Sequence, residues 1–216
     1  YKQASSPVLM VGYNRRFAPI SMQAKEAFRN LGEPLIMNFR VNAGFIPKDH
    51  WTQTAAGGGR IIGEVCHFID LMQFFTDAKP VKVFAECILS DNQKLKNDDN
   101  IAITVKMDDG SVGNLVYTAN GDKGLPKERL ELFCGDSVFV IDDFKGGQLY
   151  RNNRIRKYKF AGKGHKQEVE TFIRCLREGL QAPITFESIC LTSLTTFAIL
   201  DSLATGMPQE IFRKDQ

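Results

Sequence analysis

The sequence has 216 residues, of which 43% are hydrophobic, enough for one sizeable core in a globular chain. The formal net charge of +3 comes from 28 basic and 25 acidic residues, too close to balance to indicate nucleic-acid binding, and we interpret the basic run 151–159 as a solvated strand. No apolar run approaches the ~20 residues that span a bilayer, and no signal peptide pattern begins the chain. We therefore expect a cytoplasmic protein with neither a membrane nor a nucleic-acid partner.

Five cysteines are scattered along the chain, an odd number without a C-x-x-C pair. Such spacing favours neither a zinc site nor a redox centre, so no metal is expected. We expect all five thiols to be reduced and buried.

The first apolar segment, 7–12, reads Pro-Val-Leu-Met-Val-Gly and predicts a short strand buried on both faces of a sheet. The residues that follow do not supply such a sheet. We therefore interpret 1–17 as the end of a preceding domain and 18–216 as the domain proper.

The next elements predict a helix over 20–31, which ends at Gly32, and a strand over 34–42 with one mainly polar face. The loop 44–56 follows. It contains Lys48, His50 and Trp51, the only tryptophan, and a loop with these residue types favours contact with a ligand. Trp51 taken alone could equally cover the edge of a core.

After a central helix, alternating apolar residues predict seven strands, and Asp-Asp-Gly at 108–110 is a hairpin signal. Two helices, 166–178 and 188–205, end the chain, each followed by glycine. The fold class is therefore α+β, a large, open, mostly antiparallel sheet with helices packed on one face. The predicted strands are 81–88, 100–107, 111–118, 129–133, 137–141, 148–150 and 155–160.

The central helix is entered from the glycines at 57–59 and carries two lines of residues. Ile61, Val65, Phe68, Met72 and Phe75 form an apolar stripe that needs a core. The second line is polar and consists of Arg60, Glu64, His67 and Asp70.

His67 is the candidate proton carrier, because a neutral imidazole with a pKa near ~6.5 can accept a proton at working pH. Either Glu64 or Asp70 could hold its ring in one tautomer. Gly63 leaves one side of the ring bare. The alternative is a core histidine with a satisfied hydrogen bond. The triple glycine matches neither a dinucleotide fingerprint nor a P-loop.

Together these features resemble the C-terminal domain of the Gfo/Idh/MocA oxidoreductases, and within that family the sugar dehydrogenases. The resemblance covers nearly the whole chain. It rests on Asn-Arg-Arg-Phe-Ala-Pro at 14–19, the Trp51 loop, Gly57–Gly59, His-Phe-Ile-Asp at 67–70, Gly-Asp-Ser-Val at 135–138 and the final helices.

The resemblance implies an N-terminal Rossmann domain that binds most of the NAD or NADP, while this domain shapes the pocket for a small, sugar-like substrate. It also implies that His67 is the catalytic histidine and works with a lysine from the Rossmann half. Gly63 stands where the family often has an aspartate, so Glu64 could replace that carboxylate. The remaining expected roles are substrate binding by Lys48, His50, Asp70 and His165, and cofactor binding by Asn14, Arg16 and Trp51.

A homodimer or tetramer through the sheet is also expected, because the strands carry apolar residues on both faces. The competing hypothesis is a non-catalytic assembly module with a vestigial pocket, which the loss of the aspartate at Gly63 would suit. The sequence does not distinguish NAD from NADP, the sugar, or the direction of the reaction.

Overall fold

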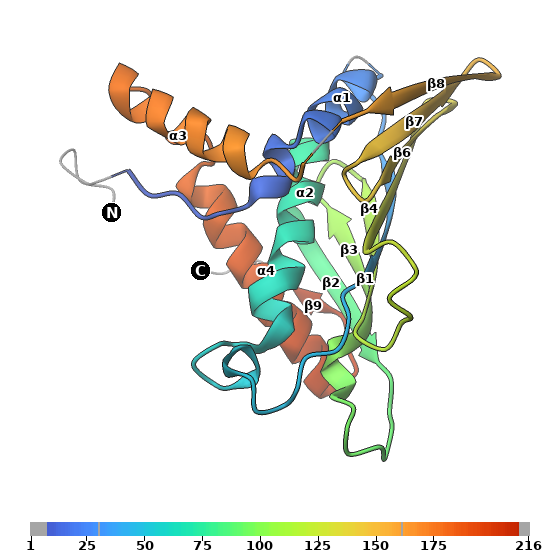
Figure 1. The fold of residues 1–216 in the computed structure, drawn as a ribbon, viewed down its shortest axis with the longest axis vertical. Coiled ribbons are helices and arrows are strands. Elements are labelled where there is room, and N and C mark those ends of the chain that lie inside the picture. Colours follow the sequence, from blue (N-terminus) through green and yellow to red (C-terminus); the bar gives the residue numbers. More distant parts are fainter. Residues whose placement is uncertain (1–7, 30, 161, 212–216) are drawn as a thin grey trace.

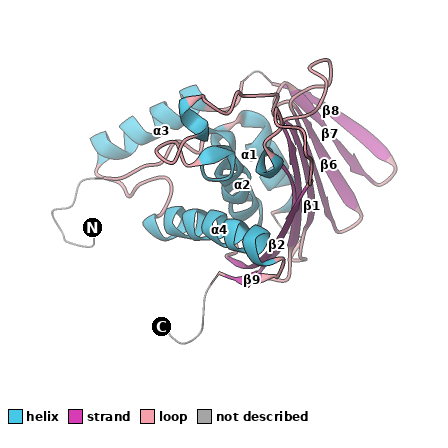
Figure 2. Cartoon of the chain, turned by 90° about the horizontal axis from the view of Figure 1, so that it is seen from below, coloured by secondary structure: helices cyan, strands magenta, loops and turns pink. Residues whose placement is uncertain are grey.

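The computed structural model describes residues 8–29, 31–160 and 162–211. A nine-stranded sheet, in the order β8-β7-β6-β5-β1-β4-β3-β2-β9, has its helices on one face (Figures 1 and 2). All strand pairs are antiparallel except β1 with β4. The predicted α+β class is confirmed.

The strands are β1 (Ile36–Asn42), β2 (Pro80–Cys87), β3 (Asn100–Met107), β4 (Val112–Thr118), β5 (Glu128–Cys134), β6 (Ser137–Asp142), β7 (Gly146–Arg151), β8 (Arg154–Lys159) and β9 (Gln209–Glu210). The α-helices are α1 (Pro19–Phe28), α2 (Cys66–Thr76), α3 (His165–Glu178) and α4 (Phe186–Thr205), with short helical turns at Asn14–Phe17, Trp51–Gln53, Ile61–Val65 and Asn97–Asp99. Every predicted strand from 34 to 160 is present, within a few residues. β9 was missed because two residues show no periodicity.

Local chemistry explains the hairpins. Gly110 has a φ of 94° at the tight turn between β3 and β4, a conformation that glycine adopts without steric cost. Asn152 and Asn153, with φ of 53° and 56°, make the turn between β7 and β8 that asparagine pairs favour.

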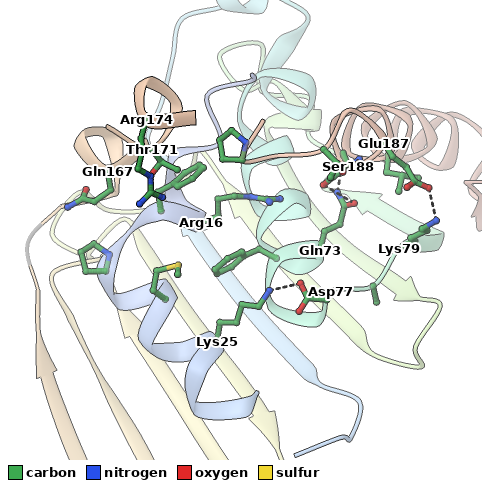
Figure 3. Close-up of a pocket in the computed structure, with 18 residues that line it drawn as sticks. Arg16, Lys25, Gln73, Asp77, Lys79, Gln167, Thr171, Arg174, Glu187 and Ser188 are labelled. Atoms are coloured by element: carbon green, nitrogen blue, oxygen red, sulfur yellow. Dashed lines mark hydrogen bonds and ion pairs between the residues drawn. The ribbon is translucent and has the colours of Figure 1, made fainter. Parts of the chain in front are cut away.

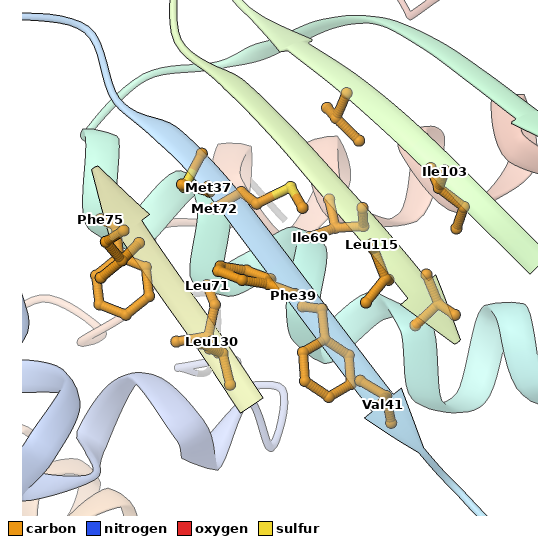
Figure 4. Close-up of a cluster of buried hydrophobic side chains, with 14 of the residues drawn as sticks. Met37, Phe39, Val41, Ile69, Leu71, Met72, Phe75, Ile103, Leu115 and Leu130 are labelled. Atoms are coloured by element: carbon orange, nitrogen blue, oxygen red, sulfur yellow. The ribbon is translucent and has the colours of Figure 1, made fainter. Parts of the chain in front are cut away.

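The core lies between the sheet and α2 (Figure 4). The predicted stripe from Ile61 to Phe75 is buried throughout, and Met37 and Phe39 of β1 face it with no exposed surface. A Cβ on Gly113 would lie 2.4 Å from the sulfur of Met72, so glycine allows α2 to pack closely on β4.

The helix α4 is long and apolar enough to cross a membrane by length and composition alone, and 44% of its apolar window is buried. Here it packs along β2 and α2. Ser202 Oγ accepts a hydrogen bond from Ala85 N (3.0 Å), which fixes α4 to the sheet. This position is that of a core helix.

Residues 8–12 form no strand in this chain, and because their strand was expected in the sheet of a preceding domain it stays a prediction. Two other expectations were wrong. The entry to α2 is a π-helical turn, Ile61–Val65, instead of continuous α-helix. All five cysteines are free, but only Cys134 and Cys175 are buried.

Candidate functional site

His67 is the second residue of α2, directly after the π-helical turn, and its ring lies edge-on to Tyr13 with 5.8 Å between centroids. Its Nδ1 is buried without a hydrogen-bond partner among the described residues. Burial and then the Arg15 guanidinium lower the pKa of His67 to about 4. The imidazole is therefore neutral at pH 7, and it is a weaker base than the pKa near 6.5 expected from the sequence would make it.

Glu64 forms an ion pair with Arg60 (2.9 Å) and a longer one with Lys127 (3.6 Å), and no hydrogen bond joins it to His67. These cations lower the pKa of Glu64 although burial opposes its ionisation. The expected reach from Glu64 to the ring assumed α-helical spacing. The π-helical turn changes the angle between the two side chains, and Arg60 engages the carboxylate.

Asp70 has no exposed surface and accepts hydrogen bonds from the Arg16 guanidinium, at Oδ2 (2.8 Å from Nε) and at Oδ1. Burial raises the pKa of Asp70 to about 6 despite Arg16. This carboxylate therefore ties the turn before α1 to α2. It does not bond His67, and it is not open to a substrate.

Arg15, Glu128 and Lys163 form a charged cluster near His67 that the sequence analysis missed. Arg15 donates to Glu128 from Nε (2.8 Å) and Nη2 (2.9 Å), and Lys163 Nζ donates to the same carboxylate (2.5 Å). Glu128 shares the inward phase of β5 with Leu130 and Leu132. That alternation was a usable signal, because a glutamate on an apolar strand face needs cationic partners.

The exposed loop 44–56 carries Lys48, His50 and Trp51, and the Trp51 side chain is 68% exposed. Among the described residues no hydrogen bond or ion pair joins these three to His67. Their turn is firmly held: Gln53 Nε2 donates to Asp99 Oδ2 (2.5 Å), and a Cβ on Gly57 would lie 2.3 Å from the Trp51 carbonyl oxygen. Position 57 therefore requires glycine, because any side chain there would collide with the backbone of this turn.

Of the remaining expected site residues, His165 at the start of α3 is exposed, and its charge contributes to lowering the pKa of His67. Asn14 is buried and donates to the Lys163 carbonyl oxygen (2.7 Å), while Arg16 is paired with Asp70. Their expected role in cofactor binding stays a prediction.

A cavity of about 770 Å³ lies between α1, the end of α2, α3 and the start of α4 (Figure 3). Arg16, Lys25 and Arg174 contribute cations to its wall, and Asp77 pairs with Lys25 there (2.5 Å). His67 does not line it. Among the described residues, no group of three or more His, Cys, Asp or Glu could hold a metal ion.

Solved oxidoreductases share this architecture of one open sheet, one helical layer and a central helix. An oxidoreductase domain protein from Kribbella flavida matches with a TM-score of 0.77 at 16% identity over 94% of this chain and 66% of its own. An oxidoreductase from Agrobacterium radiobacter, solved with NAD+, L-tartaric acid and magnesium, matches with 0.77 at 15% over 94% and 65%. UDP-N-acetylglucosamine 3-dehydrogenase from Acidithiobacillus ferrooxidans matches with 0.75 at 19% over 91% and 61%.

The family model "GFO/IDH/MocA C-terminal domain" matches residues 22–139, more than half of the chain. The chain therefore belongs to the GFO/IDH/MocA family, as the motifs predicted. No curated protein matches the sequence. The chain spans about two thirds or less of the length of the solved structures named above.

Proposed function

We propose that this chain forms the substrate-binding and proton-transfer part of an NAD- or NADP-dependent oxidoreductase acting on a sugar-like alcohol. The observation that carries the proposal is His67, a neutral imidazole on the central helix of a domain from an oxidoreductase family. Two similar structures, one solved with NAD+ and one named as a nucleotide-sugar dehydrogenase, support the cofactor and substrate class.

In this mechanism His67 takes the hydroxyl proton of the alcohol while the carbinol carbon is oxidised, and it returns a proton in the reverse direction. A bound nicotinamide would exchange the hydride. Gly63 leaves open space where a Cβ would stand, one turn before the ring. The family resemblance implies a Rossmann domain for most of the dinucleotide, so the dinucleotide would bind mainly outside this chain.

The test is His67→Ala in the full-length enzyme, measured with NAD and NADP and a panel of sugars and polyols. Loss of a positioned acid or base should lower kcat by about 10²- to 10⁴-fold with cofactor affinity unchanged. The control is Arg154→Ala, an exposed residue of β8 without an assigned role in the site, which should leave turnover unchanged. Unchanged turnover in His67→Ala would contradict the mechanism.

The isolated chain offers a second check. Calorimetry with residues 1–216 should give no micromolar binding of NADH or NADPH, because the sequence encodes neither the glycine fingerprint nor a P-loop. Micromolar affinity would show that the dinucleotide site lies here after all.

The open face of the sheet supports assembly as a second role. Six apolar side chains stand opposite one another across six adjacent strands, and we call them the apolar row. Four are exposed in this chain, two of them by more than half. The row consists of Ile155, Tyr150, Val138, Phe133, Ile36 and Val112.

We propose that a second copy of the chain covers the apolar row, because a contiguous apolar strip across the ends of six strands on an open face favours association. Sedimentation should show a dimer or tetramer at micromolar concentration. Ile36→Lys should weaken it, while Ala102→Lys on the same face but outside the row should weaken it less. A wild-type monomer would exclude this surface as the interface. A dimeric but inactive full-length protein would instead favour the pure assembly module.

A further inference from the structure

Glu128, like Asp70, is a fully enclosed acidic side chain near His67. Its side chain has no exposed surface and accepts three charge-assisted hydrogen bonds, two from Arg15 and one from Lys163. Burial opposes its ionisation, but the two cations lower the pKa of Glu128 to about 2, so it stays charged. A buried carboxylate with partners from two other segments fixes the relative position of all three.

Those segments surround His67. Arg15 lies over the ring of Phe68, 4.9 Å from its centroid, and Phe68 is the residue after His67. Tyr13, two residues before Arg15, packs against the imidazole. Lys163 immediately precedes the glycine at the N-cap of α3, and His165 is the first residue of that helix. The cluster therefore joins the turn before α1, strand β5 and the start of α3 around one imidazole.

The charges that face His67 come from each element packed around it. Among the groups that shift its pKa, Arg15 and His165 disfavour the imidazolium, whereas Glu128 and then Glu64 favour it. Glu64 is already shared between Arg60 and Lys127, and Asp70 is paired with Arg16. Two further titratable groups lie next to His67, Tyr13 of the preceding segment and Cys66 of α2.

We infer that Glu128 is a positioning residue for His67: it holds the Arg15 guanidinium beside the ring and balances the charge that the ring gains with a proton. Glu128 thus takes the part for which the sequence suggested Glu64 or Asp70. The catalytic side of this inference rests on the proposed function, but the coupling between the charges can be measured without turnover.

The experiment is a pH titration of the His67 imidazole in the 216-residue chain by ¹⁵N NMR, with His67→Gln identifying its signals. Arg15→Gln and Arg15→Lys both lose the paired hydrogen bonds of the guanidinium, but only Arg15→Gln loses the charge. Arg15→Gln should therefore raise the pKa of His67 by about one unit or more, a tenfold or greater gain in proton affinity, whereas Arg15→Lys should leave it near 4.

Glu128→Gln should shift the pKa of His67 in the opposite direction. It removes the carboxylate and leaves two cations, so His67 should stay neutral to a lower pH than in the wild type. If the cluster had only a structural role, both Arg15→Gln and Glu128→Gln would let water reach the ring. The pKa of His67 would then move toward 6.5 in both variants. Equal upward shifts in these two variants, or equal pKa values in Arg15→Gln and Arg15→Lys, would overturn the inference. Asp70→Asn is the control for loss of a buried ion pair and should not shift His67.

Kinetics of the full-length enzyme separate the two proposals. If Glu128 positions the proton acceptor, Glu128→Gln should lower kcat about tenfold or more and leave the cofactor KM unchanged. NMR could show the predicted shifts, a higher pKa of His67 in Arg15→Gln and a lower one in Glu128→Gln, while His67→Ala keeps full turnover. In that case the charge coupling stands and the proposed mechanism fails. If His67→Ala is inactive but the NMR shifts are absent, the mechanism stands and the role of Glu128 fails.

Discussion

Acid should destabilise the fold through His67, and the size of the effect follows from its environment. The pKa of His67 is about 4 in the folded chain against an ordinary value of 6.5. Between these two pH values the unfolded chain binds a proton that the folded chain does not. The contribution of His67 to stability is therefore complete above pH 6.5 and lost as pH falls to 4, a change of about 3 kcal/mol.

Asp70 works in the opposite sense over nearly the same range. Its pKa is raised to about 6 from 3.8, so the folded chain takes up a proton first and gains stability as pH falls between those values. The free energy of unfolding of the wild type can therefore change little with pH. The informative quantity is the difference between wild type and His67→Gln, which cannot titrate at this position.

Urea unfolding of both proteins at pH 7, 6, 5 and 4.5 measures that difference. As the pH falls from 7, the free energy of unfolding of His67→Gln should rise relative to that of the wild type, and this difference should approach ~3 kcal/mol by pH 4. Near-ultraviolet circular dichroism confirms that both start folded. A difference that stays constant across this range would mean that His67 titrates near 6.5 in the folded chain, and the account of a buried, Arg15-facing ring would be refuted.

Two further substitutions test the neighbouring carboxylates. Asp70→Asn should lower the free energy of unfolding at pH 7 by about 1 to 3 kcal/mol, measured as a lower melting temperature. Glu64→Gln should lower kcat less than Glu128→Gln, because Arg60 and Lys127 hold the Glu64 carboxylate away from His67, and the reverse order would return the positioning role to Glu64. Gly63→Asp should fit, since nothing lies within 4 Å of its Cβ, and a carboxylate there should raise the pKa of His67 by about 1 to 3 units in an NMR titration. An unshifted pKa would place position 63 out of reach of the ring.

The sequence by itself determined the elements. Alternation along each strand, the stripe on α2 and the glycines after α3 and α4 are local patterns, and each reappears in the structure because it reports which face must be buried within a few residues. Gly179 and Gly206 both have positive φ at the ends of their helices, as their positions predicted. His67 as the candidate proton carrier came from the sequence too, together with the motifs that place the chain in its family.

Only the tertiary structure decided which charges meet. Glu128 and Arg15 are separated by 113 residues, and they meet because the fold packs the turn before α1 against the first residue of β5. Glu64 and Asp70 are near His67 in sequence, yet Arg60 and Arg16 engage them first, since a partly buried carboxylate pairs with the cation that the fold brings within reach. Helical spacing shows which side chains can meet along one helix, but the packing of distant segments sets the environment of the imidazole.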